Sequence, residues 1–261
     1  MGSSRVVSDR EAVAAYYDRL APVYGDGEFF GARRAALVAQ IADDLVAADR
    51  VLDLGCGNGA FGVEFVARAP HALVVGADLS PAMLAAAHRR LGGRVRLLQA
   101  DAGALPFRPN SFDLVFMSHV LLLVADVEHC IAGIADSLTS GGKLVATVGV
   151  GTWRTALGAI VSPEEMAQID ALFGARRLRR SNDVGRVAAA CSAHGLRSES
   201  RSIPFSASWH ALEEWIRIRW FTMVDESQRT QAERWMSAVR SRAAGFNLRL
   251  AETVVVATKV H

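Results

Sequence analysis

The stretch VLDLGCGNGAF, residues 51–61, decides the fold. The apolar run at 50–55 predicts a buried strand, and AFGVEFVARA at 60–69 predicts the helix that follows it. Gly55, Gly57 and Gly59 lie at the turn between the two. Glycine permits tight backbone torsions at such a turn and lets a ligand approach the main chain closely. The segment therefore predicts a strand, a glycine turn and a helix that together bind a ligand.

The same alternation continues downstream of this turn. Short apolar runs predict strands at 72–80, 95–101, 111–120 and 143–150, and the segments between them predict helices at 82–91 and 125–139. Strands that alternate with crossover helices indicate a parallel sheet covered on both faces. Sheets of this kind bind ligands beyond the carboxyl ends of their strands. We therefore expect an α/β fold whose site lies at that edge.

The flanks of this block have a different composition. Residues 8–47 look helical, with a break at Ala21-Pro22, and all five tryptophans lie beyond position 150. Further helices are expected at 162–173, 182–194, 208–223 and 225–244, and strands at 197–206 and 253–260. Because no low-complexity linker interrupts the chain, we expect a single domain over 1–261. Its parts are an N-terminal helical cap (1–48), a core (49–150), an insertion (151–250) and a terminal strand (251–261).

Composition excludes several classes of protein. The 29 basic and 27 acidic residues give a net charge of +2, which is too even for a dedicated nucleic-acid binder. No stretch approaches the roughly 20 apolar residues of a membrane span, and the N-terminal residues lack an apolar signal region. Three scattered cysteines suit a reducing compartment and predict neither a disulfide framework nor a metal site. A cytoplasmic protein without a metal is therefore expected.

Acidic residues near the glycine turn narrow the choice of ligand. The spacing Gly55-x-Gly57-x-x-Ala60 also fits a nicotinamide-dinucleotide fingerprint, so the glycines alone are ambiguous. Asp53 precedes the turn, Asp78 ends the second strand and Asp101 ends the third. A pyrophosphate prefers positive potential at this turn, whereas three acids suit a ligand with an ammonium, a ribose and an adenine. An NAD(P)-dependent oxidoreductase remains the alternative.

Several motifs together resemble those of the class I S-adenosylmethionine-dependent methyltransferases. They are VLDLGCGNG, the strand-end Asp78, ADAGALPF at 100–107, FDLVFMSHVL at 112–121 and GGKLVATVG at 141–149. YDRLAPVY at 17–24 is similar to an element that precedes the core in many small-molecule members. The resemblance implies a Rossmann-like seven-stranded methyltransferase sheet with helices on both faces, N-terminal helices and a mainly helical cap inserted before the last strand. It also implies S-adenosylmethionine as the cofactor.

The resemblance assigns roles to individual residues. It implies that Gly55 and Gly57 line the methionine moiety, that Asp78 holds the ribose and that Asp101 meets the adenine. The full set that it places at the cofactor is Tyr17, Tyr24, Asp53, Gly55, Gly57, Gly59, Asp78, Leu79, Asp101, Ala102 and Ser118.

Two departures from the family's sequence pattern narrow the range of possible methyl acceptors. Leu122-Leu123 stands where quinone-type relatives often carry a histidine pair, which weakens the case for C-methylation of a quinone ring. The Asn/Asp-Pro-Pro-aromatic element of the enzymes that methylate nucleic-acid bases is absent. We therefore expect a small-molecule acceptor, methylated on oxygen, nitrogen or carbon, and no nucleic-acid or membrane partner. A homodimer would be common for this family.

Methyl transfer needs an acceptor in line with the S–CH₃ bond and, for some acceptors, a general base. His119, at the end of the fourth strand, is our first candidate for that base, and the alternative is a histidine that only lines the cofactor. His210 is a second candidate. A non-catalytic protein that retains the cofactor site remains a third interpretation of the whole chain.

The insertion is expected to bind the acceptor. Trp153, Trp209 and Trp220 are candidates for an apolar or aromatic pocket suited to a secondary metabolite, although core packing also explains such residues. The arginines in 176–180 form a dense basic run, which predicts either a solvated surface or a clamp on an anionic acceptor.

Overall fold

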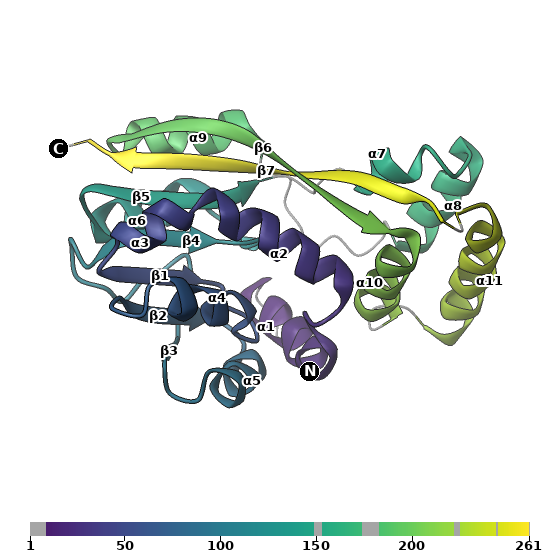
Figure 1. The fold of residues 1–261 in the computed structure, drawn as a ribbon, viewed down its shortest axis with the longest axis horizontal. Helices are drawn as coiled ribbons and strands as arrows, with labels where there is room; N and C mark the ends of the chain where they lie inside the picture. Colours follow the sequence, from purple (N-terminus) through teal and green to yellow (C-terminus); the bar gives the residue numbers. More distant parts are fainter. Residues whose placement is uncertain (1–8, 149–152, 174–182, 222–224, 244, 261) are drawn as a thin grey trace, which may run out of the picture.

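The computed structural model describes residues 9–148, 153–173, 183–221, 225–243 and 245–260. Their strands form one seven-stranded sheet in the order β3-β2-β1-β4-β5-β7-β6 (Figure 1). From one edge to the other these are β3 (Arg96–Gln99), β2 (Leu73–Asp78), β1 (Arg50–Leu54), β4 (Phe112–Met117), β5 (Leu138–Val148), β7 (Asn247–Lys259) and β6 (Leu196–Ser208). The first five pair in parallel, and β7 runs antiparallel to both β5 and β6.

Helices cover both faces of this sheet. On one face, α2 (Glu28–Gln40), α3 (Ala42–Ala47), α4 (Ala60–Arg68) and α5 (Pro81–Leu91) contribute to a buried cluster that contains Val51, Leu114 and Phe116. On the other face, α6 (Val127–Ser137) and α9 (Val184–Ala193) pack on Leu52, Val115 and Met117. Alternate residues of β1 and β4 thus point to opposite cores, as the two-residue period of a strand requires. The predicted fold class is confirmed.

The N-terminal helix α1 (Asp9–Leu20) packs on α5 near the carboxyl edge of the sheet. Tyr16 and Leu20 form a small buried cluster with Met83 of α5. Asp18 accepts hydrogen bonds from the Ser80 hydroxyl (2.5 Å) and the backbone N–H of Ala82 (3.2 Å), at the start of α5. A short 3₁₀ turn, η1 (Ala21–Val23), then leads toward α2.

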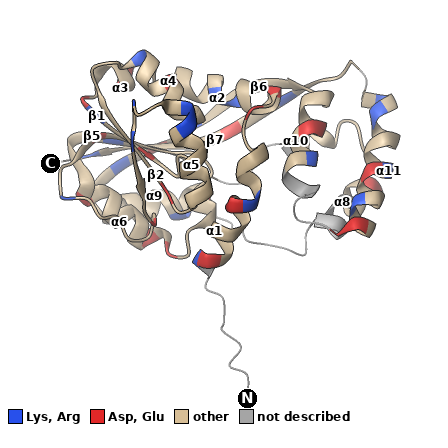
Figure 2. Cartoon of the chain, turned by 90° about the horizontal axis from the view of Figure 1, so that it is seen from below, with Lys and Arg blue, Asp and Glu red and all other residues tan. Residues whose placement is uncertain are grey.

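The inserted segment forms a second centre of packing. β6 and β7 pair over 13 residues and extend beyond the parallel strands, and four helices gather at their far end (Figure 1). These helices are α7 (Trp153–Leu157), α8 (Pro163–Phe173), α10 (Trp209–Phe221) and α11 (Glu226–Ala243). Trp209, Trp215 and Trp235 are buried there together with Phe29 and Phe30 of α2. Acidic and basic residues are interspersed along α11, in line with the even charge balance (Figure 2).

Several element boundaries differ from the predictions. The helix expected to run to residue 139 ends at Ser137, and β5 begins at Leu138 rather than at residue 143. Leu138 pairs with Phe112 before a register shift, and Gly141 adopts a positive φ of 75° within that irregular stretch. The predicted strand at 95–101 is shortened to 96–99, and the terminal strand begins at Asn247 instead of residue 253 because it pairs with β6 along its whole length.

Candidate functional site

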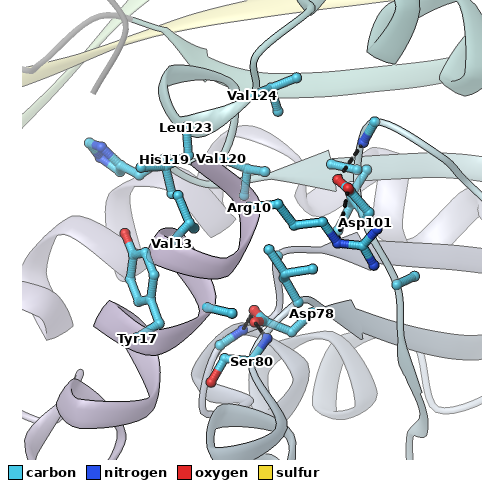
Figure 3. Close-up of a pocket in the computed structure, with 18 of the residues that line it drawn as sticks. Arg10, Val13, Tyr17, Asp78, Ser80, Asp101, His119, Val120, Leu123 and Val124 are labelled. Carbon is cyan, nitrogen blue, oxygen red and sulfur yellow. Dashed lines mark hydrogen bonds and ion pairs between the residues drawn. The ribbon is translucent and has the colours of Figure 1, made fainter. Parts of the chain in front are cut away.

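A cavity of about 330 Å³ lies at the carboxyl edge of β1, β2 and β4, and α1 closes one side of it (Figure 3). Its volume falls within the range of small-molecule and cofactor pockets. Ten of the predicted site residues line it: Tyr17, Tyr24, Gly55, Gly57, Asp78, Leu79, Asp101, Ala102, Ser118 and His119. The structure thus brings most of the predicted cofactor residues together around one space.

The glycine turn depends on backbone torsions that other residues rarely adopt. Gly55, Gly57 and Gly59 have φ values of 76°, 53° and 78°. A Cβ on Gly55 would lie 2.1 Å from the Cγ2 of Val120, so the turn also needs the missing side chain for space. Gly59 does not line the cavity. It caps α4, where a Cβ would meet Leu91 at 2.8 Å, so it acts on the conformation and packing of the turn rather than as a surface of the pocket.

Asp78 is held in a fixed orientation at the end of β2. Its two carboxylate oxygens accept hydrogen bonds from the backbone N–H groups of Gly57 (2.8 Å) and Ser80 (2.9 Å). Burial raises the pKa of this carboxyl, and the backbone hydrogen bonds offset part of that effect. The carboxylate therefore connects the glycine turn to the start of α5, where Ser80 caps the helix through the N–H of Met83.

Asp53 lies behind the glycine turn and is 2% exposed. Burial, and secondarily the charge of Asp78, raises its pKa to about 8. It does not line the cavity, so the structure leaves it beneath the turn and not in direct reach of a ligand. With this raised pKa the carboxyl is mostly protonated at neutral pH and adds little negative charge to the site.

Of the part of the site that comes from α1, the sequence analysis predicted Tyr17 but missed Arg10 and Val13. Arg10, Val13 and Tyr17 line the cavity, and their i, i+3, i+7 spacing places them on one face of the helix. The guanidinium Nε of Arg10 lies 3.4 Å from a carboxylate oxygen of Asp101, whose other oxygen accepts from the N–H of Gly103 (2.9 Å). That helical spacing was the signal available in the sequence.

The main chain of Tyr24 is hydrogen-bonded to a residue of the glycine turn. The buried side chain of Asn58 donates a hydrogen bond to the Tyr24 carbonyl, and the ring of Tyr24 meets that of Tyr17 edge-on with centroids 6.0 Å apart. A Cβ on Gly25 would lie 2.9 Å from the Asn58 amide nitrogen. The segment between α1 and α2 therefore covers the turn through close, specific contacts.

His119 lies at the other end of the cavity from Asp101 (Figure 3). Its Nε2 is 3.2 Å from Oε2 of Glu252 on β7, a partner that the sequence analysis did not identify. The wall between the two ends is apolar and includes Val120, Leu123 and Val124, which follow β4. The cavity thus has a polar end formed by Asp78 and Asp101, an apolar middle and an imidazole.

The structure separates His210 from this site. His210 is exposed at the start of α10 and lines a different hollow, which also contains Trp209, Glu213 and Arg240. His119 and His210 are not brought together, so His210 has no geometric support as a second base. The physical reason is that α10 sits at the far end of the β6–β7 ribbon (Figure 1).

Of the three tryptophans predicted to bind the acceptor, the structure describes the side chain of one, and that side chain also lies away from the cavity. Trp209 is 3% exposed, donates through Nε1 to Glu213 (3.1 Å) and packs against Trp235 with centroids 6.3 Å apart. It is a core residue of the cap, and the structure gives it no place on the described wall of the cavity. The side chains of Trp153 and Trp220, and the arginines in 176–180, lie outside the described residues.

Among the described residues, no three His, Cys, Asp or Glu side chains are grouped so that they could hold a metal ion. None of the described helices combines the length and the apolar content that crossing a membrane requires.

Comparison with known proteins agrees with this geometry. Residues 51–142 match the family model of a methyltransferase domain. The chain is similar to the demethylmenaquinone methyltransferase of Thermus thermophilus, with 38% identity over 136 residues. That match covers 51% of this chain and 60% of the relative, so the chain spans little more than half the length of this curated relative.

Solved structures share the fold over nearly the whole chain. A geranyl diphosphate methyltransferase, in complex with geranyl diphosphate and sinefungin, has a TM-score of 0.59 at 18% identity and covers 97% of this chain and 100% of that one. The [4+2]-cyclase SpnF has a TM-score of 0.61 at 20% identity, with 97% of each chain covered. At these identities the likeness shows the fold alone, and the two neighbours catalyse reactions of different kinds.

Proposed function

We propose that this chain, which belongs to the class I S-adenosylmethionine-dependent methyltransferases, transfers a methyl group from that cofactor to a small-molecule acceptor. The observation that carries the proposal is the Asp78 carboxylate, which two backbone N–H groups fix beside the positive-φ glycine turn and at the edge of the cavity. A carboxylate fixed at a strand end suits two ribose hydroxyls. Asp101, at the next strand, suits an exocyclic adenine amine.

The described lining favours this cofactor over a dinucleotide. Arg10 is the one lysine or arginine among the described lining residues, and its partner is Asp101 rather than the glycine turn. A pyrophosphate at this turn would lie next to the Asp78 carboxylate, where further negative charge is unfavourable. The sulfonium and ammonium of S-adenosylmethionine are cations, which the carboxylates of Asp78 and Asp101 attract.

Bound S-adenosylmethionine supplies an electrophilic methyl group. The chain's own part is to hold the acceptor in line, about 3–3.5 Å from the methyl carbon, and to exclude water. Tyr17, Tyr24 and α1 cover the cavity for that purpose. His119 is placed to accept a proton from an acceptor hydroxyl or amine at the end of the cavity distant from Asp101.

The lining also supports an acceptor class. Val13, Val120, Leu123 and Val124 make the middle of the cavity apolar, which favours an apolar or aromatic acceptor such as a secondary metabolite. The Thermus thermophilus relative is named for a quinone substrate, which is itself apolar and aromatic. Our departure from that substrate rests on Leu122-Leu123, and Leu122 is buried in this chain.

The predicted compartment and assembly belong to the same proposal. Cys56, Cys130 and Cys191 are all unpaired and buried, which suits the cytoplasm. A homodimer stays a prediction, and light scattering of the purified protein tests it.

Cofactor titration tests the proposal. By calorimetry, S-adenosylhomocysteine should bind with a nanomolar-to-micromolar constant, and NADH should not bind. Asp78→Ala should weaken binding of S-adenosylhomocysteine by about 1.5–3 kcal/mol, roughly 10- to 150-fold, because a charge-assisted contact is lost. Asp183→Ala is the matched control, since that carboxylate also accepts from a backbone N–H (Arg186, 2.7 Å) but caps α9 outside the cavity. Equal affinities for the two variants would contradict the assignment.

A second experiment separates a catalyst from a cofactor-binding protein. Methyl-labelled S-adenosylmethionine is incubated with a panel of phenols, amines and quinones, and the label in the product is counted. Transfer to any acceptor supports the enzyme. Tight cofactor binding without transfer to any of them favours the non-catalytic interpretation.

A further inference from the structure

Two charged side chains are buried behind His119, and neither lines the cavity. Glu252 of β7 is 4% exposed and Arg33 of α2 is 7% exposed. Oε2 of Glu252 lies 3.2 Å from Nε2 of His119, and Arg33 donates to the hydroxyl of Ser118 at 3.5 Å. The three charged or titratable groups come from α2, from β7 and from the end of β4, so the fold and not the local sequence brings them together.

Glu252 carries its charge despite its burial. Burial by itself would raise the pKa of this carboxyl, but the neighbouring His119 and the charge of Arg33 outweigh burial and lower it. An ionised carboxylate in the interior is costly unless it is paired. Its retention beside a histidine of the proposed active site therefore calls for a role.

The backbone of His119 is also held in an unusual state. Its φ is +59°, a left-handed torsion that is uncommon for residues other than glycine, and its N–H donates to the Thr147 hydroxyl of β5 at 2.6 Å. Strained torsions of this kind persist where surrounding contacts determine them, and they cluster at functional sites. The main chain is thus held from β5, and the ring lies beside a carboxylate of β7.

We propose that Glu252 is a positioning residue that sets the tautomer and the basicity of His119. A carboxylate facing Nε2 keeps the proton of the neutral ring on Nε2, which puts the lone pair on Nδ1. The same negative charge stabilises the imidazolium that forms when Nδ1 takes a proton. The charge of Arg33 also favours the ionised form of Glu252, so Arg33 acts on His119 only through Glu252.

This inference rests on the proposed function, and it makes the proton step explicit. As the acceptor oxygen or nitrogen forms its bond to the methyl carbon, the bond from that carbon to sulfur breaks. The acceptor's proton moves to Nδ1 of His119, and the sulfonium becomes a neutral thioether. His119 then releases the proton to solvent, so that charge and atoms balance over the cycle.

The groups that face His119 determine how its pKa should change when one of them is replaced. The groups that the structure describes there include Glu252 and Arg33, which are charged and lie behind it, Thr147, a neutral partner on β5, and Tyr17 of α1, which lines the same cavity. Of these, Glu252 is the group whose negative charge is next to the ring. Its replacement by a neutral isostere should therefore lower the pKa of His119.

The experiment is an NMR titration of the full chain with ¹⁵N-labelled histidine, saturated with S-adenosylhomocysteine. In the unaltered protein, the neutral ring of His119 should carry its proton on Nε2. Glu252→Gln should lower the pKa of His119 by about one unit or more, because an adjacent opposite charge is lost. Glu252→Asp, which restores the charge on a shorter side chain, should recover part of that shift. His129, which lines the cavity as well, is the internal control and should titrate unchanged.

A rate measurement then tests whether the protonation state of His119 controls the reaction. With an acceptor found in the panel above, the acid limb of the kcat/KM profile should move in Glu252→Gln by the same amount as the NMR pKa. A merely structural ion pair would lower the melting temperature and leave this limb in place. Either an unmoved limb or an unchanged His119 pKa with cofactor bound overturns the inference. Failure of S-adenosylhomocysteine to bind the unaltered chain would instead refute the proposed function, so the two failures are distinguishable.

Discussion

Replacing Gly55 with alanine tests whether the glycine turn is limited by torsion alone or also by space. At φ +76° an alanine is strained by about 1–2 kcal/mol, as expected for a left-handed residue with a Cβ. Its Cβ would also lie 2.1 Å from Cγ2 of Val120, and relieving such an overlap costs a further 1–3 kcal/mol or so. The expected total loss of unfolding free energy is therefore about 2–5 kcal/mol.

Gly92 provides the matched control. It ends α5 at φ +57°, and a Cβ there would meet nothing within 4 Å. Gly92→Ala should therefore show the torsional cost alone, about 1–2 kcal/mol. Urea unfolding of the cofactor-free protein measures both variants. Thermal unfolding should agree, since each kcal/mol lowers Tm by about 2–4 °C in a chain of roughly this size.

A double-mutant cycle isolates the overlap. Val120→Ala removes Cγ2, so the double variant Gly55→Ala/Val120→Ala should be more stable than the sum of the two single changes predicts, by about 1–3 kcal/mol. If Gly55→Ala costs no more than Gly92→Ala, or if the two changes at 55 and 120 are additive, close packing of the turn against Val120 is not what excludes a side chain there.

Two predictions concern buried carboxyls. The pKa of Asp53 is about 8 in the folded state, against a usual 3.8. Between these two values the folded state keeps a proton that the unfolded state has released. The contribution of Asp53 to stability is therefore lost as pH rises from about 4 through 8. Asp53→Asn should therefore gain stability relative to the unaltered chain as pH rises from about 4 to 8, by a few kcal/mol on the order of magnitude, as measured by urea unfolding. A pH-independent difference would contradict the burial argument. For Glu213, burial would raise the pKa, but the guanidinium groups of Arg240 and Arg217 lower it overall. The contribution of Glu213 to stability is therefore present above about pH 4.5, and it is lost as pH falls through the lowered pKa. Glu213→Gln should cost about 1–3 kcal/mol at pH 7 and progressively less in acid, measured by the same unfolding curves; a constant cost down to pH 3 would show that charge is not the cause.

The cofactor half of the molecule was predictable because its signals are local. The glycine turn, the strand-end Asp78 and Asp101, and the crossover helices each occupy a few consecutive residues. A parallel sheet then places all the carboxyl ends along one edge without further information. The parallel sheet brings eight of the ten predicted lining residues to the cavity in this way, and the other two, Tyr17 and Tyr24, come from α1 and the segment that follows it.

The other half of the site depends on pairings between distant segments. Glu252 is followed by a β-branched run, and nothing in that run indicates a histidine 133 positions earlier; the pairing of β5 with β7 sets their proximity. Trp209 illustrates the opposite error, since an apolar helical face does not distinguish a pocket wall from a core. Arg10 could have been predicted as a lining residue, because it shares a helical face with Tyr17. Its ion pair could not, because its partner Asp101 is 91 positions away.

The place of β7 in the sheet has a consequence for how the chain folds during synthesis. β7 lies between β5 and β6, so β6 has no strand of the sheet to pair with until residues 247–259 have left the ribosome. The cofactor-binding strands β1 to β4 need no such wait, because they pair with each other. The nascent chain can therefore assemble its glycine turn well before Glu252 arrives behind His119. Vectorial synthesis thus delays the pairing of Glu252 with His119 until the sheet is closed, and slow long-range pairing sets the pace of that last step.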